Sequence, residues 1–209
     1  MIIVHHLNES RSQRILWLLE ELGVPYEIRF YRRDERTKMA PDELRQVHPL
    51  GKSPVITDDG RAIAESGAII DYILRHHGAG RLRPDPSTPA FDDYVYWLHY
   101  AEGSASLPFV IDPIARSFGR RATPLRRRVD HELALNLGYI DDCLRDRDYL
   151  LGPELTAADV QLSFVGELAV AFADVSHFPN IDAWVSRFQS RPAYRLALRK
   201  GGPYRFARK

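Results

Sequence analysis

Short apolar runs alternate with helical patterns over the first third of the chain. Residues 2–4 form an apolar run too continuous for an exposed edge, which predicts a strand buried on both faces. From residue 15 to residue 22 the apolar positions recur at helical spacing, and Gly23 closes this predicted helix. A second strand is predicted over residues 26–31. Such a strand–helix–strand unit predicts two parallel strands.

After a short predicted helix over residues 41–47, two apolar runs flank Asp59-Gly60, which is a strong signal for a two-residue hairpin turn. The first of these runs opens with Ser53-Pro54. Proline has no N–H for a central ladder, so either this strand is an edge or the bond before Pro54 is cis.

A third helical pattern, over residues 67–76, follows the hairpin directly. Ser66 stands immediately before it, at the position expected to cap the helix. Unpaired backbone N–H groups at a helix start attract carboxylates and phosphates, and Glu65 beside them offers a negative charge. These neighbours predict a binding site for a small zwitterion.

The chain changes character near residue 80. Glycine and proline gather over residues 78–90, which is typical of a linker, and strand patterns almost disappear beyond it. Helical patterns cover most of the remainder, and Thr156 and Asp159 have the spacing of a capping box. We therefore predict a domain at 1–79 with a mixed four-stranded sheet and helices, a linker at 80–90, and an all-helical domain at 91–209.

Composition narrows the function classes. The 209 residues are 44% hydrophobic and 27% charged with a net charge of +1, which gives no reason to expect a nucleic-acid or membrane partner. The single cysteine, Cys143, excludes an intrachain disulfide, a Cys-x-x-Cys redox pair and a cysteine-based metal cluster. No charged-then-apolar leader and no apolar run of membrane-spanning length is found, so we expect a cytoplasmic protein.

The order of these elements resembles that of the soluble glutathione transferases over essentially the whole chain. Four segments carry the resemblance: Ser53-Pro54-Val55 looks like the family's cis-proline loop, Glu65-Ser66 like its acidic–serine pair, and residues 10–14 and 156–159 like its first turn and its helical cap. The resemblance implies a thioredoxin-like N-terminal domain followed by an all-helical domain. The first turn points to a bacterial-looking, serine-type subgroup.

The resemblance also implies roles in glutathione binding. Ser66 and the helix start suit the γ-glutamyl carboxylate, and Glu65 suits the ammonium group. The Val55 backbone beside Ser53 and Pro54 could pair with the cysteinyl main chain as an added strand does. Lys52 either binds the glycyl carboxylate or is merely solvated.

The thiolate is the reactive form of glutathione, so a hydrogen-bond donor near the sulfur is required to lower the pKa of the thiol. Ser10 stands four residues before Arg14, the spacing of the serine-type classes, and is the predicted catalytic hydroxyl. Ser12 and Asn8 remain rivals, and a plain capping role for Ser10 is the structural alternative. His5 and His6 are weaker candidates for acid–base groups.

The resemblance implies an enzyme that conjugates glutathione to a small apolar electrophile, with glutathione as co-substrate and with no metal or other cofactor. Tyr96, Tyr100 and Phe109 are the predicted electrophile pocket, although a plain core stripe would give the same pattern. A homodimer is also expected. Two alternative functions stay open: a glutathione-dependent reductase of disulfides or peroxides, and a non-catalytic glutathione-binding or assembly module.

Overall fold

The computed structural model describes residues 1–208, and these form two compact units. The first contains Met1–Arg83 together with Phe188 and the residues after it, and the second contains Pro84–Arg187. The division after Arg83 falls inside the predicted linker. The C-terminal segment from Phe188 lies in the first unit, whereas the sequence had placed it in the helical domain.

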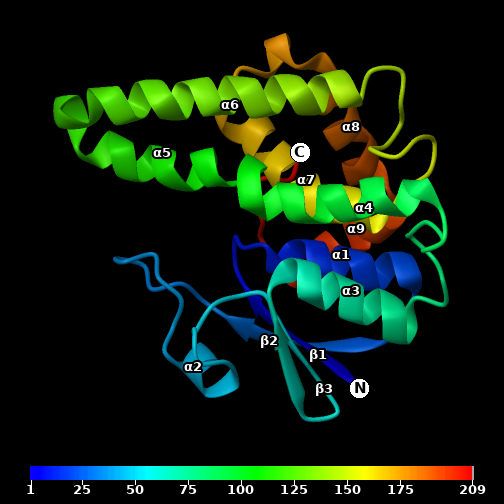
Figure 1. The fold of residues 1–209 in the computed structure, drawn as a ribbon. Helices are drawn as coiled ribbons and strands as arrows, with labels where there is room; N and C mark the ends of the chain where they lie inside the picture. Colours follow the sequence, from blue (N-terminus) through cyan, green and yellow to red (C-terminus); the bar gives the residue numbers. More distant parts are fainter. Residues whose placement is uncertain (209) are drawn as a thin grey trace. The chain divides into compact units, whose positions relative to one another are not determined.

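The first unit is built on a four-stranded mixed sheet (Figure 1). Its elements are β1 (Ile2–Leu7), α1 (Ser12–Leu22), β2 (Tyr26–Tyr31), α2 (Glu43–Val47), β3 (Val55–Asp58), β4 (Arg61–Ala64), α3 (Ser66–His77) and α9 (Pro192–Gly201). The strand order is β2-β1-β3-β4, with β1 parallel to β2 and antiparallel to β3. The predicted strand–helix–strand unit and hairpin are therefore confirmed, and β1 is a central strand as its apolar run predicted.

Alternation along β1 decides which side chains reach each face of the sheet. Val4 and His6 point to one face, which α1 covers, and α1 and α3 lie side by side there (Figure 1). Leu7 points to the other face, where it packs with Tyr31 of β2 and Leu44 of α2. Both faces are thus covered, so the two polar residues of β1, His5 and His6, are buried as well.

The helix α9 packs against α1, although the two are separated by most of the chain. Trp17 of α1 stacks on Phe188 and meets Tyr194 edge to face. At the rim Glu21 pairs with Arg191 at 2.5 Å. The packing of α9 on α1 could not be predicted from the sequence, because each helix shows an apolar stripe but nothing that identifies its partner.

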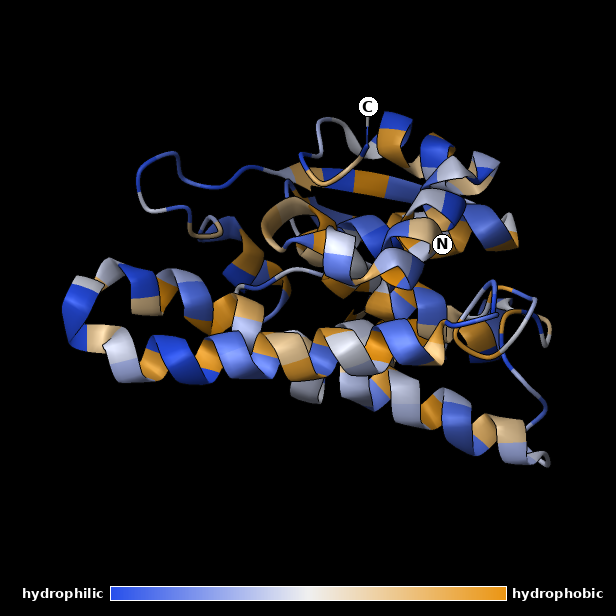
Figure 2. Cartoon of the chain, turned by 90° about the horizontal axis from the view of Figure 1, so that it is seen from above, coloured by the Kyte–Doolittle hydropathy of each residue, from blue (hydrophilic) through white to orange (hydrophobic). Residues whose placement is uncertain are grey.

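The second unit is helical, as predicted. Its elements are α4 (Pro89–Tyr100), the π-helix η1 (Ala101–Ala105), α5 (Leu107–Ser117), the 3₁₀ turn η2 (Gly119–Ala122), α6 (Thr123–Cys143), α7 (Ala157–Phe172), the 3₁₀ turn η3 (Val175–His177) and α8 (Pro179–Ser190), whose last three residues belong to the first unit. Apolar segments recur among polar ones along α6 (Figure 2), which is the pattern of an amphipathic helix. In α7 every residue from Ala157 to Ala169 is buried.

The predicted capping box at the start of α7 is confirmed. Asp159 is fully buried and accepts hydrogen bonds from Thr156 N at 3.0 Å and from Leu150 N at 2.9 Å. Trp184 Nε1 of α8 also donates to it, at 3.0 Å. One carboxylate therefore joins the cap of α7, the loop before it and α8. Within the described residues, no helix combines the length and the apolar character needed to cross a membrane.

Candidate active site

Three hydroxyl groups and an imidazole meet where β1 ends and α1 begins. Ser10 Oγ lies 2.8 Å from Ser12 Oγ, which lies 2.9 Å from His6 Nδ1. On its other side Ser10 Oγ is 3.5 Å from Ser53 Oγ, and Ser53 donates to the backbone carbonyl of His5 at 3.0 Å. Ser10 is 5% exposed, and Ser12 is fully buried. We call His6, Ser12 and Ser10 the serine–histidine line.

The protonation state of His6 sets the direction of this line. Burial lowers the pKa of His6 to about 4, so its ring is neutral near pH 7. The ring donates to the backbone carbonyl of Gly201, and since Nδ1 faces Ser12 the donor is Nε2. The Ser12 hydroxyl then donates to Nδ1 in preference to a longer 3.3 Å contact with the Leu7 carbonyl. Consequently Ser10 donates to Ser12, and its hydrogen points inward.

Gly201 makes this contact possible by its lack of a side chain. A Cβ atom at that position would lie 2.7 Å from Gln13 Oε1 and 2.9 Å from Leu16 Cδ1, both on α1. The end of α9 can therefore approach α1 and β1 closely enough for its carbonyl to reach His6. The predicted weak candidate His6 is thus a buried, hydrogen-bonded residue, and so is His5, whose Nδ1 lies 3.0 Å from Tyr31 Oη.

Asn8 is held from the opposite side of the turn. Its Oδ1 accepts from the backbone N–H of Arg33 at 2.9 Å, and its carbonyl accepts from Arg33 Nε at 3.2 Å. Arg33 also donates to the carbonyls of Glu9, at 3.4 Å, and Lys38, at 3.0 Å. Glu9 has φ 50, a left-handed conformation that non-glycine residues seldom adopt. The guanidinium of Arg33 therefore braces the turn that carries the predicted catalytic residues.

The loop before β3 contains the predicted glutathione-binding residues Lys52 to Val55. The Ser53–Pro54 bond is cis, and β3 is paired on both sides, so of the two alternatives for this proline the cis bond is the one observed. Pro54 and Val55 are buried, and Val55 opens the strand between Ala64 and His5. Lys52 is exposed, which leaves both of its predicted roles open.

The start of α3 differs in one respect from the sequence prediction. The helix begins at Ser66 itself, so Ser66 does not cap it. Its hydroxyl accepts from Arg14 Nη2 at 2.8 Å, and Arg14 is buried, so this arginine joins α1 to α3. The preceding Glu65 has φ 68 and is exposed. A strained, exposed acidic residue beside a helix start is a feature often found at binding sites.

Comparison with known proteins identifies this arrangement. A family model described as glutathione S-transferase, N-terminal domain, matches residues 10–76, and one described as glutathione S-transferase, C-terminal domain, matches residues 104–192. The chain belongs to the glutathione S-transferase family. Glutathione S-transferase 3 of Schizosaccharomyces pombe is 34% identical over 96% of this chain and 88% of its own length. Glutathione S-transferase 1 of Saccharomyces cerevisiae is 31% identical over 96% of this chain and 95% of its own.

A solved structure supports the same assignment for this glutathione transferase. The crystal structure of a glutathione S-transferase from Actinobacillus pleuropneumoniae superposes with a TM-score of 0.91. It is 32% identical and covers 100% of this chain and 97% of the other. The predicted family and fold class are therefore confirmed.

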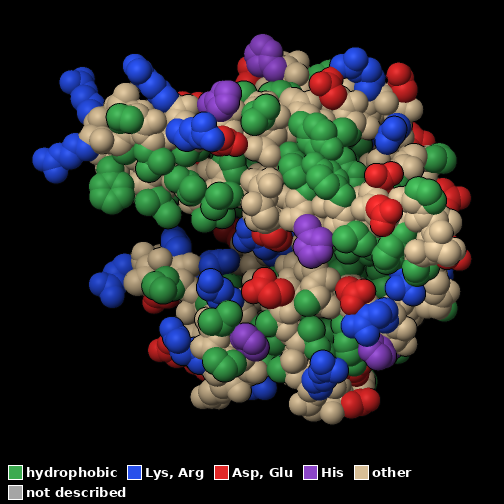
Figure 3. All heavy atoms as spheres, in the orientation of Figure 1, with side chains coloured by type: hydrophobic (Ala, Val, Ile, Leu, Met, Phe, Trp, Pro, Cys, Tyr) green, Lys and Arg blue, Asp and Glu red, His purple; other side chains and the backbone are tan. Residues whose placement is uncertain are grey.

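The aromatic residues predicted for the electrophile pocket of the transferase lie in the second unit. Tyr96 and Tyr100 of α4 stack on each other with ring centroids 5.5 Å apart, and both meet Tyr139 of α6. Trp97, which is buried, stacks on Tyr139 beneath these rings. Hydrophobic side chains gather on the surface over α4 and α6 (Figure 3). Phe109 lies on α5, beyond the π-helix, so the structure does not place it in this ring cluster.

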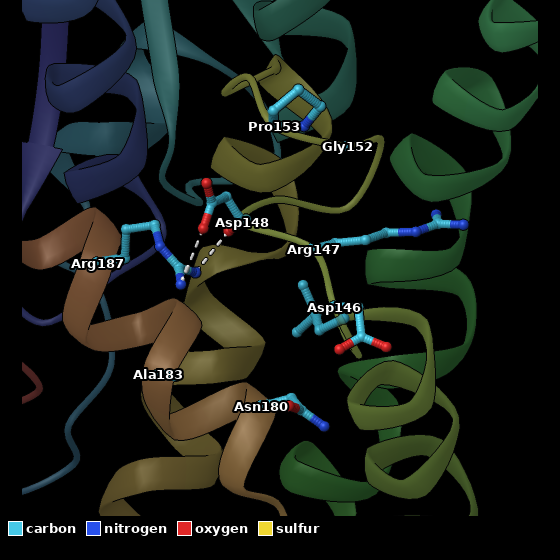
Figure 4. Close-up of a pocket in the computed structure, with 9 residues that line it drawn as sticks. Asp146, Arg147, Asp148, Gly152, Pro153, Asn180, Ala183 and Arg187 are labelled. Carbon is cyan, nitrogen blue, oxygen red and sulfur yellow. Dashed lines mark hydrogen bonds and ion pairs between the residues drawn. The ribbon is translucent and has the colours of Figure 1, made fainter.

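A pocket of about 380 Å³ lies elsewhere in the second unit, between the loop after α6 and α8 (Figure 4). Its lining is polar, and Arg187 pairs with Asp148 across one side at 3.1 Å. In the close-up Arg147 extends away from that pair. None of the predicted site residues lines this pocket. It is therefore not a candidate for the transferase site.

Sequence reasoning missed two residues that shape the turn, Arg33 and Gly201. Each acts on the turn from a distant part of the chain, through a guanidinium or a backbone carbonyl. Arg33 stands in a run of charged residues, 32–36, and its neighbours give no sign that one arginine folds back onto the turn. Gly201 was missed because a glycine at the end of a helix is an ordinary termination signal.

The neutral state of His6 predicts a pH dependence of folding. In the unfolded chain a histidine titrates near 6.5, whereas folded His6 titrates at about 4, so the stability it contributes is present above pH 6.5 and is lost as the pH falls to 4. We expect the free energy of unfolding to fall by about 3 kcal/mol more over this range in the wild type than in His6→Gln. Urea titrations at several pH values measure this difference.

The exposed His131 provides the control, because His131→Gln should keep the wild-type pH dependence. If His6→Gln and the wild type lose stability in parallel between pH 6.5 and 4, then His6 is not the buried neutral group described here.

Proposed function

We propose that the first unit binds glutathione and ionises its thiol for transfer to an electrophile. The observation that carries this proposal is the meeting of the Ser10 and Ser53 hydroxyls, the Ser53–Pro54 loop and the start of α1 in a member of this family. Glutathione would lie along the opening of β3. Val55 itself is already paired with His5 and Ala64, so the cysteinyl main chain would pair with the backbone just before Pro54 and not with Val55.

The γ-glutamyl end of glutathione carries an ammonium group and a carboxylate, and the glycyl end carries a second carboxylate. Glu65, which is exposed, would accept the ammonium group, while the Ser66 hydroxyl and the backbone N–H groups at the start of α3 would bind the neighbouring carboxylate. Ser66 already accepts from Arg14, which fixes its hydroxyl oxygen and leaves its hydrogen to donate. Lys52 would neutralise the glycyl carboxylate.

The sulfur would then lie against Ser10. The hydrogen of Ser10 points to Ser12 in the free protein, so it turns to the sulfur as the thiol ionises. The 11-residue helix α1 starts at Ser12, and the positive end of its dipole also favours a thiolate there. This chemistry needs no metal or other cofactor. The second substrate would be an electrophile with an apolar body that contacts Tyr96, Tyr100 or Phe109.

Two assays on the purified protein test this proposal. Retention on immobilised glutathione with elution by free glutathione reports binding, and conjugation to chlorodinitrobenzene reports turnover. Conjugation at a rate above the uncatalysed reaction is the expected result. Retention without turnover would instead favour a binding module. Turnover confined to disulfides or peroxides would favour a reductase, which would require two glutathione molecules because the only cysteine, Cys143, lies at the end of α6.

Replacing Glu65 tests the binding mode. In Glu65→Gln the ammonium group loses an opposite charge in a solvent-exposed position, which is worth about 1 kcal/mol. We expect the KM for glutathione to rise about five-fold with kcat almost unchanged. Glu154→Gln, at an exposed site of the second unit, is the matched control. An unchanged KM in Glu65→Gln would show that glutathione binds in another way.

We further propose that the protein is a cytoplasmic homodimer. Four large apolar side chains are about half exposed along α5 and its end: Leu107, Val110, Ile114 and Phe118. Exposed apolar area of this extent is often covered by another chain. The mass in solution, measured by light scattering, distinguishes a dimer from a monomer.

A further inference from the structure

One guanidinium group holds two backbone positions that share an unusual conformation. Arg33 Nη2 donates to the carbonyl of Glu9 at 3.4 Å, and Arg33 Nη1 donates to the carbonyl of Lys38 at 3.0 Å. Glu9 has φ 50 and Lys38 has φ 58, values that residues other than glycine seldom adopt. Such a conformation costs free energy and persists only where its surroundings hold it. Arg33 therefore stabilises both positions.

The first of these positions carries the predicted catalytic hydroxyl. Glu9 directly precedes Ser10, so the backbone of Glu9 decides the direction in which the Ser10 side chain leaves the turn. Arg33 also holds Asn8, because its Nε donates to the Asn8 carbonyl at 3.2 Å while Asn8 Oδ1 accepts from Arg33 N at 2.9 Å. This reciprocal pair fixes the start of the turn.

The second position belongs to a loop, residues 34–38, that is closed by its own hydrogen bonds. Asp34 Oδ1 accepts from the backbone N–H groups of Arg36, at 3.1 Å, and Thr37, at 2.6 Å. It also accepts from Thr37 Oγ1 at 2.8 Å, and the Asp34 carbonyl accepts from Lys38 N at 2.9 Å. These bonds keep the Lys38 carbonyl in place for the guanidinium.

Resting on the proposed function, we propose that Arg33 is a positioning residue for the glutathione thiolate. It acts through the backbone of the turn that carries Ser10, and its hold on that turn depends on the 34–38 loop. A hydroxyl donor and a helix start can lower the pKa of a bound thiol by about two, provided that the donor stays within hydrogen-bond distance of the sulfur. A looser turn would keep Ser10 at that distance less of the time, so less of the thiol would be ionised near neutral pH.

The pH profile of kcat/KM and the ultraviolet absorbance of the bound thiolate test this role. Lysine keeps the positive charge but has one nitrogen, which cannot reach the carbonyls of Asn8, Glu9 and Lys38 together. We expect Arg33→Lys to raise the pKa of the bound thiol by about one and to lower kcat/KM about five-fold at pH 6.5. At pH 9 the thiol is ionised in both proteins, so the two rates should agree within about two-fold.

Asp34→Ala loosens the same turn without changing Arg33. It removes the three contacts that Asp34 Oδ1 accepts, so kcat/KM at pH 6.5 should fall about two-fold, with the pKa of the bound thiol raised. The double variant should lose little more than Arg33→Lys alone, because both changes act on the turn through one guanidinium. Arg36→Gln, an exposed position in the same loop, should keep the wild-type profile.

The charged groups that act on Arg33 keep their charge over the range of this test. Burial lowers the pKa of Arg33 and the Glu9 carboxylate raises it, but a guanidinium group stays charged from pH 6 to pH 9, and glutamate side chains are ionised there. The other charges that act on it, those of Arg205 and Arg11, are guanidinium groups as well. His6 titrates at about 4, below this range. A change in the profile between pH 6 and pH 9 therefore reports the thiol.

Two results would overturn this role. One is a wild-type pH profile in Arg33→Lys. The other is a loss of kcat/KM by the same factor at pH 6.5 and at pH 9, since Arg33 would then act on something other than thiol ionisation. A wild-type profile in Asp34→Ala would show that the loop takes no part. If the wild type itself binds glutathione but shows neither thiolate absorbance nor conjugation, the transferase function fails, and the role of Arg33 fails with it.

Discussion

Ser10→Ala is expected to lower kcat/KM for glutathione conjugation by about 50-fold near pH 6.5. A free cysteine thiol has a pKa of about 8.5, and a hydroxyl donor with a helix start can lower the pKa of a bound thiol by about two units. Alanine removes that donor. With the pKa back near its free value, about one percent of the thiol would be ionised at pH 6.5, against about half in the wild type. The measurements are the pH profile of kcat/KM and the ultraviolet absorbance of the thiolate in the enzyme–glutathione complex.

The neighbouring residues make this experiment specific. Ser186→Ala, at an exposed site of α8, controls for the loss of a hydroxyl as such. Ser12→Ala should raise kcat/KM, whereas Ser10→Ala lowers it, because Ser12→Ala removes the group that holds the Ser10 hydrogen inward. If Ser10→Ala keeps the full rate while Asn8→Ala or Ser12→Ala loses it, the catalytic role belongs to one of those residues.

Asp159→Ala is expected to give the largest loss of stability, about 3–5 kcal/mol. The carboxylate is fully buried and accepts four hydrogen bonds, two from backbone N–H groups, one from Thr156 Oγ and one from Trp184 Nε1. Burial raises the pKa of Asp159 to about 6, so at pH 7 the group is ionised, which is the form that accepts all four bonds. Alanine would leave these donors buried without a partner.

Urea unfolding at pH 7 measures this loss. Asp159→Asn should be destabilised as well, because its amide group places a donor against the donors that surround it. Asp174→Ala is the matched control, since Asp174 is exposed, accepts from Ser176 and lies 3.7 Å from the exposed His177. A loss below about 1 kcal/mol in Asp159→Ala would show that the cap, the loop before it and α8 do not depend on this carboxylate.

Local patterns predicted the fold well. The strand over residues 26–31, the hairpin around Asp59-Gly60 and the capping box at Thr156 are all present in the structure. Each depends on a few neighbouring residues whose backbone preferences or side-chain bonds are satisfied within one turn or hairpin. The error at Ser66 has the same origin: a serine before an apolar pattern normally caps, but Arg14 binds its hydroxyl instead, from 52 residues away.

By itself the sequence determined which segments form strands and helices, and which polar residues flank the first and third helices. Only the tertiary structure decided how those polar residues are oriented. His6 is tied to Gly201, Asn8 to Arg33 and Glu9 to Arg205, each through a contact between distant segments. The spacing of apolar residues along the sequence shows which face of a helix or strand is buried, because the direction of the side chains repeats with the backbone period. A single hydrogen bond or ion pair leaves no repeating pattern in the sequence. It can be identified only in the folded structure, where packing brings the donor and the acceptor together.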